Sequence, residues 1–304
     1  MKKIILLLSV SFVFVIGSLV SCKQSDSQSN KETILKGKTT LLVDETVKPL
    51  IEDQIAVFES TYNKAKIVLE AKSEKEAMQA FLKDTSRIVV LSRELSTDET
   101  KIFEQLKIKP RTTKVATDAI ALISNKKDLD TLIAMQDVVA FLKGSMQTKI
   151  KGLVFDNPNS STVRYMTALA GVKEVPQNGV YSFKSNEEVV KFVSENDGMI
   201  GVVGVNWLFQ PTVKIKDYLT NINVLSVKGL NKNSYFAPTQ NNLAEGTYPL
   251  ARDLFIINCQ GYSGLGMGFA SFLAGEIGQR IVLKSGMLPT TMPGRKILII
   301  DKEN

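Results

Sequence analysis

Short apolar runs alternate with amphipathic segments along the first half of the chain. In the segment after the first run, Ile51, Ile55 and Phe58 recur at intervals of four and three residues, the spacing of one helical face. The apolar runs have the length of single strands and cover residues 39–43, 66–71 and 87–92. Strands that alternate with helices of this length indicate a parallel sheet with right-handed crossover connections. The pattern therefore predicts an α/β fold.

Helix starts in this half carry capping residues. Ser73 is followed three positions later by Glu76, and Ser96 by Glu99, which is the spacing of a capping box. Pro49 suits the first turn of the helix before them. These residues predict where three helices begin.

The second half repeats the alternation. An apolar strand at residues 115–124 is interpreted as leaving the first lobe of the structure for a second one. Further strands are predicted at residues 151–155, 198–205, 223–227 and 248–258, and helices at residues 160–171 and 185–195. Residues 228–247 are rich in Asn and predict a long loop. A final helix is expected to bury Phe269, Phe272, Leu273 and Ile277 on one face.

The N-terminal segment has the layout of an export signal. Lys2 and Lys3 precede an apolar run over residues 4–20, as in a secretory signal peptide. A membrane anchor is the alternative interpretation, because the run is close to the shortest that spans a bilayer.

The end of that run favours the export signal over the membrane anchor. Residues 19–22 (Leu-Val-Ser-Cys) resemble a bacterial lipobox, and the polar, Ser-rich stretch behind them cannot bury enough apolar area to fold. We therefore expect a signal peptide at residues 1–21, lipidation of Cys22, and a flexible tether over residues 22–36. A lipid-modified Cys22 would anchor the protein to a membrane, with palmitate among its acyl chains.

The amino-acid composition excludes several kinds of catalytic and metal-binding sites. The chain contains no histidine, which excludes Ser-His-Asp and Cys-His catalysis as well as histidine metal sites. With Cys22 lipidated, Cys259 is the remaining cysteine, and its apolar surroundings predict a buried thiol. The 38 basic and 31 acidic residues give a net charge of +7, but no clustered basic stripe is present. We therefore expect no nucleic-acid partner.

Hydroxyl side chains stand at turns between a strand and a helix. Thr46, Ser73 and the run Ser160-Ser161-Thr162 occupy three such turns. A helix N-terminus offers unpaired N–H groups and partial positive charge, and in an open α/β sheet such turns converge at the carboxyl edge. The pattern predicts an anion site, although each residue taken alone fits an ordinary helix cap.

Several motifs together resemble the phosphate-binding proteins of ABC importers, the PstS-like family. Residues 159–162 (Asn-Ser-Ser-Thr) are similar to the family's glycine–serine–glycine–threonine anion loop. Weaker matches are residues 91–95 (Leu-Ser-Arg-Glu-Leu), Asn186 with Val189 and Val190, and residues 198–201 (Gly-Met-Ile-Gly), 248–252 (Tyr-Pro-Leu-Ala-Arg), 278–279 (Gly-Gln) and 286–289 (Gly-Met-Leu-Pro). The resemblance extends over about residues 37–300.

The resemblance implies a two-lobed clamshell of the type II periplasmic-binding-protein fold. Each lobe is expected to be a mostly parallel sheet flanked by helices, and the chain is expected to cross twice between the lobes. The expected division is lobe I at residues 37–118 and 247–304 and lobe II at residues 119–246.

The resemblance also implies which residues contact the ligand. The matching positions are Thr46, Ser73, Ser92, Ser160, Ser161 and Thr162. Two positions depart from the family pattern, because Arg93 stands where an acid is usual and Asp156 stands where an arginine is usual. We interpret the pair as exchanged in sign and facing across the cleft. The alternative is that both are rim charges and the ligand is a different one.

The expected function is that of an extracytoplasmic solute-binding lipoprotein. It would be a monomer without cofactor or catalytic activity that captures phosphate, or a related tetrahedral oxyanion, for the membrane subunits of an ABC importer. One alternative is a surface lipoprotein that uses the same fold to bind another anion or a protein partner. A hydrolase is the other alternative, and the absence of histidine argues against it.

Three further motifs have ordinary explanations. Ser124 and Lys127 match a serine–x–x–lysine pattern, but its usual partner motifs are missing. The glycine-rich residues 264–268 lack the spacing of a dinucleotide site and fit a closely packed helix. Asp128 and Asp130 fit a solvated turn better than a metal site.

Overall fold

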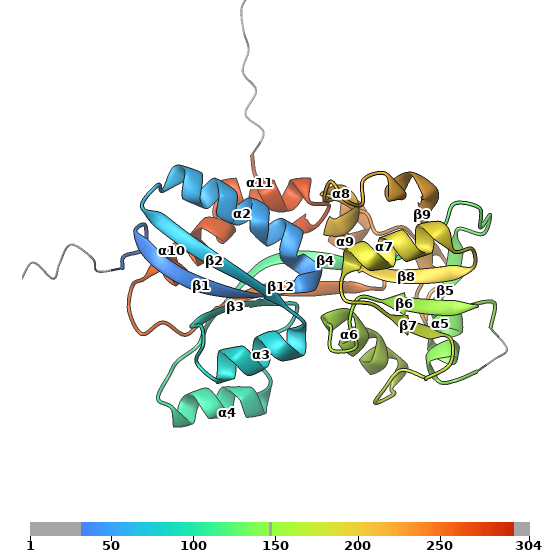
Figure 1. Cartoon of the computed structure of the whole chain (residues 1–304), viewed down its shortest axis with the longest axis horizontal. Coiled ribbons are helices and arrows are strands. Elements are labelled where there is room, and N and C mark those ends of the chain that lie inside the picture. The colour runs from blue at the N-terminus through green and yellow to red at the C-terminus, as the bar shows by residue number, and fades with distance from the viewer. Residues whose placement is uncertain (1–31, 146–147, 295–304) are drawn as a thin grey trace, which may run out of the picture. The chain divides into compact units, whose positions relative to one another are not determined.

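Ten strands form one mixed sheet in the computed structural model, which describes residues 32–145 and 148–294. The order along it is β2 (Ala65–Lys72), β1 (Gly37–Asp44), β3 (Ile88–Leu91), β12 (Ala251–Asn258), β4 (Arg111–Asn125), β8 (Met199–Gly204), β6 (Gly152–Phe155) and β7 (Val180–Ser182) (Figure 1). Two short strands, β9 (Ile222–Val224) and β13 (Leu288–Pro289), also pair with β4. Strands β1–β3 define the first lobe below, and β6–β8 the second.

Two long strands connect the lobes. Within each lobe the strands run parallel, as predicted, whereas β12 and β4 are antiparallel to each other and to their neighbours β3 and β8. Strand β4 pairs with β12 through residues 111–119 and with β8 through residues 120–123. The change of partner lies at the expected boundary between lobes, and the domain division itself remains a prediction.

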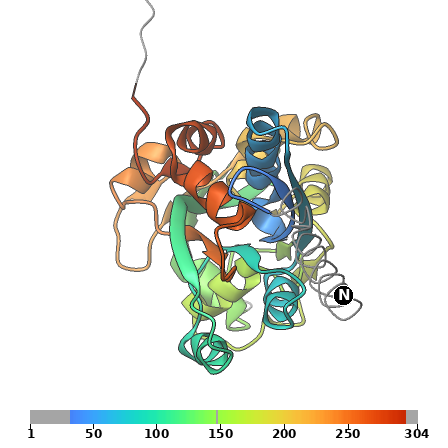
Figure 2. The same cartoon turned by 90° about the vertical axis from the view of Figure 1, so that its left-hand side faces the viewer.

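Helices cover both faces of the first lobe's sheet. One face carries α2 (Lys48–Thr61), α10 (Leu265–Ala274) and α11 (Glu276–Lys284), and the other carries α3 (Glu74–Leu82) and α4 (Thr97–Gln105) (Figures 1 and 2). Successive residues of β1 point to opposite faces, so Leu41 and Val43 join one core cluster and Leu42 the other. Covering on both faces explains why the strands of this lobe read as continuous apolar runs.

The second lobe contains more elements than the sequence pattern predicts. The helices α6 (Ser161–Ala170) and α7 (Asn186–Glu195) are found as expected. The elements that the pattern did not predict are β5 (Leu132–Ala134), α5 (Met135–Leu142), β7 and α8 (Asn206–Phe209). The predicted loop at residues 228–247 contains β11 (Tyr235–Phe236) and α9 (Gln240–Ala244), and β11 and β5 flank β10 (Ser226–Lys228) in a small second sheet. Two 3-10 turns, η1 (Glu45–Val47) and η2 (Tyr218–Asn221), complete the described elements.

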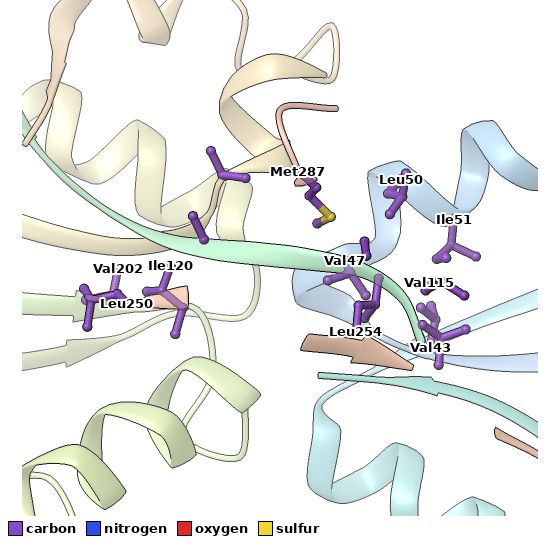
Figure 3. Packing of buried hydrophobic residues seen from close by; sticks show 14 of the residues in the cluster. Val43, Val47, Leu50, Ile51, Val115, Ile120, Val202, Leu250, Leu254 and Met287 are labelled. Atoms are coloured by element: carbon purple, nitrogen blue, oxygen red, sulfur yellow. The ribbon is translucent and has the colours of Figure 1, made fainter. Parts of the chain in front are cut away.

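The largest core cluster extends along β4 into both lobes. Val115, on the part of β4 in the first lobe, packs near Leu254, whereas Ile120, further along the same strand, packs near Val202 and Leu250 (Figure 3). All of these side chains are buried. The junction between the lobes is therefore built on a strand with residues buried in the core of both lobes.

The predicted last helix is two helices. Helix α10 ends at Ala274 and α11 begins at Glu276, so the single buried face that we expected does not continue. Phe269 and Leu273 are buried, but Ile277 is 49% exposed, and its predicted burial was wrong. The start of α11 packs closely against the end of α10, because a Cβ at Gly278 would lie 2.3 Å from the Phe272 carbonyl oxygen, an approach that only glycine allows.

The glycine-rich start of α10 is a packing feature, as predicted. A Cβ at Gly268 would lie 1.8 Å from the carbonyl oxygen of Ile34, and one at Gly266 would lie 2.6 Å from Ile88. Ile34, near the end of the expected tether, therefore lies against this helix, and Thr33 pairs with Lys36 through a 2.8 Å backbone hydrogen bond. Within the residues that the structure describes, no helix has the length and apolar character needed to cross a bilayer.

Candidate functional site

The turns at the carboxyl ends of β1 and β6 face each other at the junction of the lobes. Asp44 ends β1 and caps η1, where its carboxylate accepts the Thr46 N–H at 3.3 Å. Ser160 caps α6, and its hydroxyl oxygen accepts the Val163 N–H at 3.3 Å. Helix α6 ends at Gly171, which adopts a left-handed conformation with φ 68°. Local capping thus fixes where the first turn of α6 lies.

The hydroxyl groups from the two turns meet. The Thr46 hydroxyl lies 3.2 Å from the Ser161 hydroxyl, and the Ser160 and Thr162 hydroxyls lie 2.8 Å apart. Asp156 accepts hydrogen bonds from Thr162 at 2.8 Å and from Thr46 at 3.4 Å. All five side chains are buried. We call the group that they form with their neighbours the central cluster: Asp44, Glu45, Thr46, Asp156, Ser160, Ser161, Thr162, Asn186 and Arg252.

The cation of the central cluster is Arg252, which lies on the connecting strand β12. Arg252 is opposite Asp118 of β4 in the strand register, and its Nε donates to the Asp118 carboxylate at 2.9 Å. Its Nη1 donates to the Ser161 hydroxyl at 2.8 Å. Burial lowers the pKa of Arg252, but the Asp118 and Asp44 carboxylates outweigh it and the pKa is raised. The guanidinium therefore stays charged at the base of α6.

The sequence pattern does not identify Arg252 as a site residue, because an arginine within a predicted strand does not by itself indicate a binding site. It ends the motif at residues 248–252 that carried part of the family resemblance, so a signal was present. Its contact with Ser161, however, spans 91 residues and depends on the crossing of β12 between the lobes.

Carboxylates outnumber this cation in the central cluster. The Asn186 side-chain amide donates to Glu45 at 2.8 Å and to Asp156 at 3.1 Å, and so links two acids from different lobes. Burial, followed by the nearby Glu74 charge, raises the pKa of Asp44 to about 7. Burial, followed by the charge of Asp156, raises the pKa of Glu45 to about 8. Two of the acids are therefore poised to hold protons near neutral pH.

A second charged group lies beside the central cluster and is called the mouth cluster: Glu74, Ser92, Arg93, Glu99 and Arg164. The Glu74 carboxylate on α3 accepts hydrogen bonds from Arg164 on α6 at 2.5 and 3.1 Å. It also accepts the Arg93 Nε at 3.1 Å and the Ser92 hydroxyl at 3.3 Å. Because its side chain is only 4% exposed, Glu74 is a nearly buried link between the two lobes.

The expected pairing of Arg93 with Asp156 is not what the structure has. Arg93 donates two hydrogen bonds to Glu99, at 2.7 and 2.8 Å, besides its bond to Glu74. These hydrogen bonds to Glu99 are the main reason that the Arg93 pKa is raised. Among the described residues, Asp156 has hydroxyl and amide partners and lies in the other cluster. Arg93 is instead held by acids on α3 and α4 of its own lobe.

The structure divides the remaining predicted site residues between these groups. Thr46, Ser160, Ser161 and Thr162 come together in the central cluster. Ser92 belongs to the mouth cluster, and the Ser73 hydroxyl donates to Glu76 at 2.7 Å within the capping box of α3.

A cavity of about 730 Å³ opens between α3 and α6 next to the mouth cluster. Its lining includes Glu74, Arg93 and Arg164 of the mouth cluster and Ser160 of the central cluster. Apolar side chains, among them Met78 on α3, form part of the wall. The cavity can therefore hold a group larger than a phosphate ion beside the hydroxyl cradle.

Further contacts hold the lobes together around the central cluster. The Lys75 N–H donates to the Asn159 carbonyl at 3.2 Å. The indole N–H of Trp207 donates to the Thr46 carbonyl at 2.8 Å, so the single tryptophan of the sequence lies at the junction. Such contacts describe a closed arrangement of two lobes, with the central cluster enclosed between them.

The other candidate residues lie away from this junction. Cys259, directly after β12, is 2% exposed, as predicted, and burial raises the pKa of its thiol to about 11. Lys127, of the serine–x–x–lysine pattern, pairs with Asp197. The described residues contain no group of acids and cysteines that could hold a metal ion. Cys22 and the predicted signal peptide lie outside the described residues.

Sequence comparison assigns the family. The chain matches the PBP superfamily domain, the periplasmic-binding-protein superfamily, over residues 27–276. It belongs to that superfamily. No curated protein matches the sequence.

Solved structures show the same fold at low sequence identity. A protein described as a phosphate ABC transporter substrate-binding protein with bound phosphate, from Clostridium perfringens, aligns with a TM-score of 0.67 at 18% identity, covering 84% of this chain and 100% of that one. An ABC-type phosphate transport receptor from Vibrio cholerae aligns with a TM-score of 0.62 at 17% identity, covering 83% and 100%. The regulatory domain of CcmR from Synechocystis, in complex with 2-PG, aligns with a TM-score of 0.52 at 13% identity, covering 78% and 96%. The two-lobed type II fold is thus shared by transport receptors and regulatory domains.

Proposed function

We propose that this protein is an extracytoplasmic solute-binding protein that captures a tetrahedral oxyanion and delivers it to an ABC importer. Phosphate is the oxyanion that we expect it to bind. The observation that carries the proposal is the central cluster, where hydroxyls from both lobes meet the buried guanidinium of Arg252 at the N-terminus of α6. Proteins of similar fold include a phosphate ABC transporter substrate-binding protein and a phosphate transport receptor.

The chemistry of the cluster suits an oxyanion. Thr46, Ser161 and Thr162 supply hydroxyl donors, and the first turn of α6 supplies N–H groups and the positive end of its dipole. Arg252 adds a charge that does not titrate at physiological pH. Because the donors come from both lobes, an anion between them would hold the lobes together, as hinge closure requires.

The proposal also covers membrane anchoring, oligomeric state and catalysis. Lipidation of Cys22 after export would anchor the protein to the outer side of a membrane, where an importer can receive the ligand. We propose a monomer that binds without turnover, because the site holds donors and acids but no activated nucleophile of the kinds that histidine supports.

Calorimetry on protein stripped of bound anion tests this proposal. Phosphate should bind saturably, and the fluorescence of Trp207, whose indole contacts Thr46, should report the same affinity. Arsenate, sulfate and molybdate in parallel titrations define the selectivity. A protein that binds none of these anions would refute the proposal, and formation of a product would favour the hydrolase.

The cavity favours a second candidate ligand, a phosphomonoester. Its phosphate would occupy the central cluster, and its organic part would extend past Ser160 into the cavity of about 730 Å³. Glycerol 3-phosphate and phosphoglycolate, titrated beside inorganic phosphate, distinguish the two. Tighter binding of an ester than of phosphate would identify the ester as the ligand.

A further inference from the structure

Three carboxylates from the two lobes converge on two shared donors. Thr46 donates its hydroxyl toward Asp44 at 3.2 Å and toward Asp156 at 3.4 Å. The Asn186 amide donates to both Glu45 and Asp156, at 2.8 and 3.1 Å. A hydroxyl has a single proton to donate, so the acids have fewer donors than their oxygens can accept.

One oxygen of this group is left without a partner. The Asp44 Oδ2 is fully buried and makes no hydrogen bond to any residue that the structure describes. A buried ionised carboxylate with an unpaired oxygen is unfavourable, whereas a protonated one loses the charge that makes burial expensive.

The surrounding charges do not neutralise the three acids. Arg252 of β12 faces Asp44 but also pairs with Asp118 of β4, and Glu74 of α3 adds a further negative charge near Asp44. Lys48 on α2 attracts Glu45 and is also paired with Glu52 at 3.6 Å. An oxyanion placed among these groups adds more negative charge.

We propose that the central cluster takes up protons when the lobes close on an oxyanion, and that Asp44 and Glu45 hold them. The inference rests on the proposed function, because it concerns closure on the same ligand. The protons come from solvent, each forms an O–H bond on a carboxylate oxygen, and the buried acids become neutral. A neutral acid can also donate a hydrogen bond to the oxyanion, which an ionised one cannot.

The pKa shifts of Asp44 and Glu45 determine the pH range over which anion affinity changes and the direction of that change. In the closed arrangement the pKa of Asp44 is about 7 and that of Glu45 about 8, raised by burial from ordinary values of 3.8 and 4.5. With the lobes apart, solvent would return both groups toward their ordinary values. Groups with a raised pKa stabilise the closed state at low pH, and this stabilisation is lost as the pH rises through about 7 and 8. Anion affinity should therefore fall between pH 6 and pH 8 by at least about tenfold.

Proton uptake can be measured directly. Phosphate titrations by calorimetry at pH 7, in buffers that differ in ionisation enthalpy, give the number of protons bound per phosphate. The wild type should take up about one proton more than the double variant Asp44→Asn with Glu45→Gln. The ionisation of phosphate itself contributes equally to both proteins and cancels in the difference. Glu104→Gln, at an exposed position on α4, is the matched control and should equal the wild type.

The outcomes separate this inference from the proposed function. If the double variant fails to bind, the single variants give the same comparison, and Asp44→Asn and Glu45→Gln should each remove part of the pH dependence of phosphate affinity between pH 6 and pH 8. Phosphate binding with equal proton uptake in wild type and variants would overturn the inference and leave the proposed function standing. Absence of oxyanion binding between pH 5 and pH 8 would overturn both.

Discussion

Arg252→Lys tests whether the fork of the buried guanidinium holds the central cluster together. In the structure Nε and Nη2 both lie 2.9 Å from the Asp118 carboxylate, while Nη1 donates to Ser161 at 2.8 Å. Lysine keeps the positive charge, but its single ammonium group cannot span a carboxylate on β4 and a hydroxyl on α6 as a rigid planar fork does.

The size of the effect follows from the bond that is lost. A hydrogen bond to a charged group contributes about 1.5–3 kcal/mol, and neither Arg252 nor Ser161 is exposed enough for water to replace it. We expect the free energy of unfolding to fall by about 1.5–3 kcal/mol and phosphate affinity to fall by about ten- to a hundredfold. Asp118 keeps a counter-charge, so the variant should still fold.

Urea unfolding followed by Trp207 fluorescence, together with phosphate calorimetry, measures both effects. Arg280→Lys is the matched control, because Arg280 makes the same kind of pair with Glu276 on the exposed surface of α11. That substitution should change the free energy of unfolding by less than about 1 kcal/mol and leave phosphate binding unchanged. Wild-type affinity and stability in Arg252→Lys would refute the role assigned to the guanidinium, and so would an equal loss in the control.

Three further predictions concern other parts of the protein. Asp156→Asn removes a charge from the hydroxyl cradle, so sulfate affinity should rise by at least about tenfold and selectivity for phosphate should relax; calorimetry with both anions would show whether it does. Glu74→Gln weakens the ion pair with Arg164 that joins the two lobes, so phosphate should dissociate about tenfold faster, as measured by stopped-flow Trp207 fluorescence. An unchanged dissociation rate would show that this ion pair does not keep the lobes closed on the ligand. Labelled palmitate should enter the wild type in cells but not Cys22→Ala, and equal labelling would disprove lipidation at that position.

Local features of the sequence predicted local structure well. The capping boxes at Ser73 and Ser96 and the cap at Ser160 form as expected, because each depends on residues within one helical turn. Val115 and its neighbours were recognised as a strand because two covered faces require a continuous apolar run. The last helix was misjudged because its break depends on the backbone packed against Gly278.

Part of the candidate site was also predictable. Thr46, Ser161 and Thr162 were expected at one edge of the sheet, and the structure brings them together. The pairing of Arg93 was not predictable, because Glu74 and Glu99 lie within reach only after α3 and α4 pack beside β3.

The sequence by itself determined the alternation of strands and helices, the positions of the helix caps and the absence of histidine chemistry, since these depend on residue type and short spacing. Only the tertiary structure decided which charges meet. Arg252 contacts Ser161 and Asp118 because β12 and β4 cross between the lobes, and Glu45 shares Asn186 with Asp156 because two turns from different lobes face each other. The interaction of two charges depends on their separation in space and on their burial, and neither is contained in the order of residues along the chain.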